Sequence, residues 1–95
     1  MSSRQKTKKQ EINEENIRRA IEIMNFVVSD IAAPRNIRNF VKDAIDLLGK
    51  KDTSPGMRSA TAIQMLDEAS QDTNVPMLSR TRIWSALSIL ESVKD

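Results

Sequence analysis

Residues 30–38 read DIAAPRNIR and residues 72–80 read DTNVPMLSR, two versions of one pattern, Asp-x-x-x-Pro-x-x-x-Arg. The agreement extends outward from these turns at a constant offset of 42 residues. When residues 20–48 are placed over residues 62–90, seven of the 29 positions are identical. Helical patterning explains matched apolar residues, but it does not explain an aspartate, a proline and an arginine at one shared spacing. We therefore interpret the chain as one helical hairpin used twice.

Apolar residues on both sides of these turns recur every three or four residues, which is the spacing of amphipathic helices. They predict four helices, at about residues 13–32, 35–48, 55–71 and 76–93. Asn13 is the predicted N-cap of the first helix, and Pro34 ends it because the residue before a proline disfavours the helical conformation. No stretch shows the two-residue alternation of a strand, so we expect an all-α fold.

A 42-residue unit of two helices falls in the size range of HEAT and armadillo repeats. Such arrays, however, need about three or more units to bury their apolar faces. Two hairpins bury these faces better by packing on each other, so the sequence predicts a four-helix up-and-down bundle made of two pseudo-repeated helical hairpins. The alternative is an open two-repeat HEAT-like stack.

The charge distribution divides the chain into a short tail and one domain. Residues 1–10 hold four Lys or Arg residues, no acid and no apolar residue after Met1. A segment with nothing to bury is expected to be mobile, so we predict a flexible basic tail over residues 1–10. Residues 11–95 are the predicted single four-helix domain.

The composition excludes several kinds of chemistry. The chain has no histidine, cysteine or tyrosine, which excludes Cys/His zinc sites, disulfides and Ser-His or Cys-His nucleophile pairs. The carboxylates fall where solvated helix surfaces are expected, and no glycine-rich phosphate loop is present. We expect no catalytic residues, no cofactor, no metal site and no enzyme activity.

Hydropathy gives no reason to expect a membrane protein. No uncharged run is longer than the one at residues 83–90, whereas a membrane-spanning helix needs about 20 apolar residues. We therefore expect a cytoplasmic protein without a membrane partner.

The repeated turn carries four predicted hairpin staples, Asp30, Pro34, Asp72 and Pro76. In one interpretation each aspartate caps the next helix or pairs with the arginine four residues after the proline, which fixes the hairpin angle. In the other, the arginines Arg38 and Arg80 form an anion-binding pair brought together by the pseudo-symmetry.

Two aromatic residues break the repeat. Trp84 occupies the position of Lys42, and Phe26 occupies that of Glu68. Because a charged residue indicates a position facing water, something is expected to cover both rings. They either pack on each other or form a candidate interaction surface for a second copy or another protein, since tryptophan is enriched in interface hot spots. The sequence thus favours a non-catalytic protein–protein interaction or assembly module, as a homodimer or as a subunit of a complex.

The alternative function is an RNA- or ribonucleoprotein-binding accessory protein. It would use the basic tail and a positively charged face. That candidate face comprises Arg35, Arg38, Lys42, Arg80 and Arg82. The second predicted helix also carries Asp43 and Asp46, and three aromatic residues are too few for a base-stacking platform. Nucleic-acid binding is therefore the less favoured hypothesis.

Three strings carry a resemblance to a known family. They are SDxxxPRNIR at residues 29–38, AxAIxxLDE at residues 60–68 and DxNxPxxxRTxIW at residues 72–84. With them the chain resembles uncharacterised protein family 0147, a group of small archaeal all-helical proteins, over about residues 12–93. The resemblance implies a short four-helix up-and-down fold and an archaeal, cytoplasmic source, and it implies no activity or catalytic residues.

Overall fold

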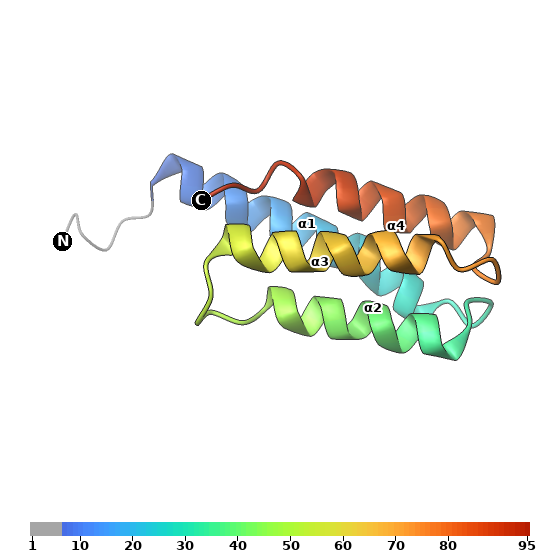
Figure 1. The fold of residues 1–95 in the computed structure, drawn as a ribbon. Helices are drawn as coiled ribbons and strands as arrows, with labels where there is room; N and C mark the ends of the chain where they lie inside the picture. The colour runs from blue at the N-terminus through green and yellow to red at the C-terminus, as the bar shows by residue number, and fades with distance from the viewer. Residues whose placement is uncertain (1–6) are drawn as a thin grey trace.

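The computed structural model describes residues 7–95, which form four α-helices. These are α1 (Lys8–Ser29), α2 (Arg35–Leu48), α3 (Pro55–Ser70) and α4 (Met77–Leu90). Each helix runs antiparallel to the one before it, and α1 also packs along α4 (Figure 1). An open stack would keep the first and last helices apart. The all-α, up-and-down four-helix bundle is therefore confirmed, and the HEAT-like alternative is wrong.

The two hairpins are equivalent in how they bury their residues. Every position from 30 to 48 has the same degree of burial as the position 42 residues later, from 72 to 90. The core is built from matched pairs, in which small residues alternate with larger ones. The pairs include Ala20/Ala62, Met24/Leu66, Val41/Ile83, Ala44/Ala86 and Leu48/Leu90. The repeat read from the sequence is thus also a repeat of the packing.

The two proline turns lie at one end of the bundle, and the loop at residues 49–54 lies at the other (Figure 1). Pro34 is the N-cap of α2 and Pro76 is the N-cap of α4. Ser54 is the N-cap of α3, where its hydroxyl accepts a hydrogen bond from the Met57 backbone N–H. These helix starts agree with the sequence to within a residue.

The start of α1 was predicted wrongly. The helix begins at Lys8 rather than near Asn13, because Thr7 and Gln10 form a capping box in which each side chain accepts the other's backbone N–H. Residues 8–10 of the predicted tail are therefore helical, while residues 1–6 lie outside the described residues. Asn13 is 5% exposed and lies inside the helix. The helix also ends at Ser29, three residues earlier than expected.

Candidate functional site

The two repeated aspartates close the proline turns from within. Asp30 Oδ1 accepts a hydrogen bond from the Ala32 backbone N–H at 2.9 Å, and Asp72 Oδ1 accepts one from Asn74 at 2.8 Å. This bond to the residue two positions on is an Asx turn, which suits the short aspartate side chain. Neither α2 nor α4 has a side-chain hydrogen bond at its N-cap, which is a proline in both helices. The expectation that the aspartates cap the following helices is therefore wrong.

The repeated arginines bind backbone carbonyls of their own turns. Arg38 Nε donates to the Ala33 carbonyl at 3.1 Å, and Arg80 Nη2 donates to the carbonyls of Asp72 and Val75 at 2.8 and 3.3 Å. Within residues 7–95 neither arginine makes an ion pair with its aspartate. Both guanidinium groups thus bind backbone atoms of their own turns, and the expected ion pairs with the aspartates do not form. This arrangement gives no support to an anion-binding pair of Arg38 and Arg80.

A third arginine, which the sequence analysis missed, has the same role in α3. Arg58 is 6% exposed, and its guanidinium donates from Nε to the Thr53 carbonyl at 2.9 Å and from Nη1 to the Leu48 carbonyl at 2.6 Å. The signal was present in the sequence, because all three arginines lie four residues after an N-cap. Each therefore reaches back to the residue that precedes the cap.

The five residues of the predicted cationic face do not form one face. Arg35 and Lys42 are exposed on α2, where exposed Asp43 and Asp46 accompany them. Arg82 lies on α4, and α2 and α4 occupy opposite corners of the bundle without packing on each other. The structure therefore separates these cations into two groups, with acids beside one of them.

Phe26 and Trp84 are both exposed and do not cover each other. Phe26 is 60% exposed and Trp84 is 48% exposed. The Arg82 guanidinium lies 5.1 Å from the centre of the Phe26 ring, which places Arg82 on the side of α4 that faces α1. Trp84 is two residues further on, about 200° around the helix, and so points away from Phe26. Mutual packing of the two rings is therefore wrong for this chain.

The two second helices of the hairpins expose very different residues at equivalent positions. On α2 the exposed positions are Arg35, Asn36, Asn39, Lys42, Asp43 and Asp46. On α4 they are Met77, Leu78, Thr81, Trp84, Ser85 and Ser88, which we name the α4 outer face. Four of the six α2 residues are charged, whereas none of the α4 residues is. Because burial is the same in both helices, the fold itself does not require this difference.

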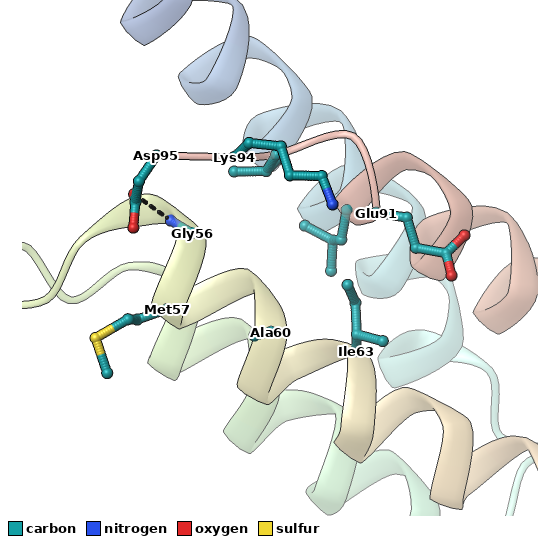
Figure 2. Close-up of a pocket in the computed structure, with 9 residues that line it drawn as sticks. Gly56, Met57, Ala60, Ile63, Glu91, Lys94 and Asp95 are labelled. Atoms are coloured by element: carbon teal, nitrogen blue, oxygen red, sulfur yellow. Dashed lines mark hydrogen bonds between the residues drawn. The ribbon is translucent and has the colours of Figure 1, made fainter.

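A groove of mixed apolar and charged lining lies between α3 and the end of α4 with residues 91–95 that follow it (Figure 2). Its volume is about 590 Å³. The residues that line it, which define the α3–α4 groove, are Gly56, Met57, Ala60, Ile63, Leu90, Glu91, Val93, Lys94 and Asp95. Figure 2 shows Met57, Ala60 and Ile63 along α3, with Glu91 and Lys94 on the opposite rim. An open groove of this volume, with apolar residues on its α3 side and charged residues on the opposite rim, can receive a large amphipathic side chain.

The segment of residues 91–95 forms one wall of the groove and is anchored at its end. The Asp95 carboxylate accepts hydrogen bonds from Ser54 Oγ at 2.7 Å and from the Gly56 backbone N–H at 2.8 Å (Figure 2). These two hydrogen bonds lower the pKa of the Asp95 carboxyl group. A Cβ atom at Gly56 would lie 2.7 Å from that carboxylate, so the glycine permits the contact. Asn13 holds the same segment by donating to the Lys94 carbonyl at 2.6 Å.

Asp30 makes a second contact that joins the two hairpins. Its Oδ2 accepts a hydrogen bond from the fully buried Ser79 hydroxyl at 2.9 Å. Hydrogen bonds from the Ala32 N–H and from Ser79 lower the pKa of the Asp30 carboxyl group, and the nearby charges of Arg82 and Arg38 act in the same direction. The aspartate therefore links the first proline turn to α4.

The part of the chain that the structure describes shows neither a metal cluster nor a membrane span. No three acidic side chains among residues 7–95 come close enough to hold a metal ion. None of the four helices has the length and the hydropathy needed to cross a bilayer. The prominent features are instead the uncharged α4 outer face and the α3–α4 groove.

Together these features define a small four-helix up-and-down bundle with an exposed apolar surface on its last helix. The model of a family described as Uncharacterised protein family (UPF0147) matches residues 3–93. The chain therefore belongs to this family, as the resemblance in the sequence indicated.

Relatives and solved structures agree with this assignment. A UPF0147 protein of Metallosphaera sedula is 46% identical over 83 residues, which cover 87% of this chain and 93% of the relative. A UPF0147 protein of Desulfurococcus amylolyticus is 41% identical and covers 87% of this chain and 91% of the relative. Both source organisms are archaea.

The fold of the family is known from crystals. The structure of a family member from Thermoplasma acidophilum is similar with a TM-score of 0.82 and 28% identity, covering 88% of this chain and 99% of that one. A second crystal structure, of a protein of unknown function, has a TM-score of 0.81 and 36% identity, covering 86% of this chain and 93% of that one.

Proposed function

We propose that this protein is a non-catalytic interaction module that binds a protein partner through the α4 outer face. The observation that carries the proposal is the contrast between two helices of equal burial. The exposed face of α2 is charged, and the equivalent face of α4 is uncharged and includes Met77, Leu78 and Trp84.

The residue types on α4 support binding to protein. The centres of protein–protein interfaces are depleted in charged residues and enriched in tryptophan and methionine. Met77 and Leu78 are 65% and 58% exposed, which is an unfavourable environment for large apolar side chains that nothing covers. Thr81, Ser85 and Ser88 have short side chains, so a partner helix can approach the backbone of α4 closely.

Site-specific photocrosslinking tests this proposal with a control that the repeat provides. A photoreactive amino acid is placed at Ser85 on α4 or at its equivalent Asp43 on α2, and the protein is expressed and irradiated in an archaeal host. We expect a defined protein adduct from position 85 and none from position 43. The adduct should disappear in Trp84→Lys, because this change puts onto α4 the charge that α2 carries at Lys42.

Equal crosslinking from positions 85 and 43 would contradict the proposal, since the two helix faces would then be equally covered. An adduct that survives Trp84→Lys would also contradict it. Circular dichroism of each variant confirms that the helix content is unchanged. The presence of lysine at the equivalent position of α2 indicates that the fold tolerates this substitution.

A further inference from the structure

We infer that the partner on the α4 outer face is a second copy of this chain, in which Trp84 of each copy fills the α3–α4 groove of the other. This inference rests on the proposed function and specifies the partner of the same surface. It uses two features of the molecule that complement each other, an exposed indole ring and a groove with an apolar side and a polar rim.

The indole and the groove lie on the same side of α4. Glu91 lines the groove, and Trp84 precedes it by seven residues, which is about two helical turns. Residues seven apart project in nearly the same direction and are separated by about 10 Å along the helix axis. The molecule thus presents a projecting side chain and a cavity next to each other on one face.

This arrangement suits a symmetric dimer. If a two-fold axis crosses α4 between Trp84 and the groove, each copy places its indole over the groove of the other, and the pair closes without leaving a free site. The axis would pass near Leu87 and Ser88. A residue on such an axis meets its own copy, so a charge there would face a like charge, and both of these residues are uncharged.

The chemistry of the groove matches its proposed occupant. Met57, Ala60 and Ile63 contribute accessible apolar side chains, Leu90 and Val93 line the groove almost fully buried, and the groove volume is about 590 Å³. Glu91, Lys94 and Asp95 form a polar rim that can face the indole N–H. A buried tryptophan removes about 150–250 Å² of surface from water and is a typical hot-spot residue when it enters a pocket. The exposed Trp84 supplies this side chain, and it is the only tryptophan of the chain.

Two variants separate the indole from the groove. Trp84→Lys removes the indole, and Ala60→Glu places a charged side chain at an exposed position inside the groove. Thr61→Glu is the matched control, because it adds the same charge at an exposed position one residue away that does not line the groove. Sedimentation equilibrium of the full chain measures association, and circular dichroism checks that each variant is folded.

We expect the parent protein and Thr61→Glu to form dimers. Trp84→Lys and Ala60→Glu should each weaken self-association by more than about tenfold, as loss of a hot spot does. In the parent protein the emission of Trp84 should shift to shorter wavelength as the concentration rises, because the ring leaves water on association.

Mixing the two defective variants gives the decisive result. In a mixed pair, the indole of the Ala60→Glu copy meets the intact groove of the Trp84→Lys copy, so one of the two contacts is restored. A 1:1 mixture should therefore associate more strongly than either variant alone. A mixture that associates no better than its components overturns the inference.

Other outcomes distinguish this inference from the proposed function. A parent protein that remains monomeric at millimolar concentration overturns the inference, as does a dimer that Ala60→Glu leaves intact. In either case the proposed function stands if crosslinking from position 85 still yields an adduct that depends on Trp84. If the adduct from position 85 is absent, both the inference and the proposed function are overturned.

Discussion

Three arginines hold the starts of three helices. Arg38, Arg58 and Arg80 each lie four residues after an N-cap and donate to the carbonyl of the residue before that cap. A helix start leaves carbonyl groups of the preceding loop without partners from the helix, and a guanidinium group can supply several donors in fixed directions. The same residue type at the same position thus serves all three interhelical loops.

Arg58→Lys should lower the free energy of unfolding by about 1.5–3 kcal/mol, the range for hydrogen bonds to a charged group. The lysine ammonium cannot reproduce the planar fork that reaches the carbonyls of Thr53 and Leu48. Urea unfolding followed by circular dichroism measures the change. Arg38→Lys is the control and should cost less, because Arg38 is only half-buried and its bond to Ala33 is a single one. Equal decreases in the free energy of unfolding for the two variants would show that the two hydrogen bonds of the buried Arg58 guanidinium add no more stability than the single bond of Arg38.

At the scale of the helices, the repeat separates what the fold requires from what it does not. Helices α2 and α4 bury equivalent positions, and both have a proline at the N-cap. Their exposed faces, in contrast, share no residue. A position in contact with the core is limited by volume and polarity, whereas an exposed position is free to vary. The fold therefore does not require the uncharged face of α4, and this is the observation on which the proposed function rests.

The anchor of residues 91–95 on α3 gives a prediction about coupling between two residues. A Cβ atom at Gly49 would make only ordinary van der Waals contacts, whereas one at Gly56 would displace the Asp95 carboxylate. Gly56→Ala should therefore raise the free energy of unfolding less than Gly49→Ala does, or lower it. In an Asp95→Ala background, Gly56→Ala should instead stabilise the protein by about 0.4–1 kcal/mol, as glycine replacement does at compatible sites. Urea unfolding of the double-mutant cycle measures the coupling. Additive effects would contradict the close contact.

Much of the helical structure was predictable because it depends on local patterns. The starts of α2, α3 and α4 follow from prolines and a serine at the caps, and the apolar spacing gave the buried faces. The start of α1 was missed because Thr7 and Gln10 form their capping box within a polar, basic segment that has no apolar pattern. Asn13 looked like a cap, but its amide bonds to Lys94, which is 81 residues away.

At the scale of the whole molecule, two carboxylates tie distant segments together. Asp30 links the first proline turn to α4 through Ser79, and Asp95 links the end of the chain to α3 through Ser54. The two bonds join residues 49 and 41 positions apart in the sequence, and an ionised carboxylate is a stronger acceptor than a protonated one. They therefore make the stability of the bundle dependent on pH.

The protein should lose stability in acid. Because the folded state lowers the pKa of Asp30 and Asp95, it binds fewer protons than the unfolded chain at low pH. Above about pH 4, the ordinary pKa of aspartate, the two carboxylates make their full contribution to the free energy of unfolding. This contribution is lost as the pH falls through their lowered pKa values. Urea unfolding between pH 7 and pH 2 should show this decline. The free energy of unfolding of the double variant Asp30→Asn and Asp95→Asn should decline less over this range. If the double variant shows the same pH dependence as the parent protein, the two aspartates are not its source.

The sequence by itself determined the class of fold, the repeat and the buried face of each helix, because these depend on periodicity and local turn residues. It indicated the family through the strings at residues 29–38, 60–68 and 72–84. It also identified Phe26 and Trp84 as exposed positions, since each departs from a charged equivalent. Only the tertiary structure decided how surface residues are grouped. It placed Phe26 of α1 and Trp84 of α4 apart from each other, and it divided the cations between opposite corners of the bundle. It also formed a groove from residues of α3, Leu90 and the segment that follows it. These neighbours are set by how helices pack, and the order of residues within one helix carries no information about which residues lie across from it.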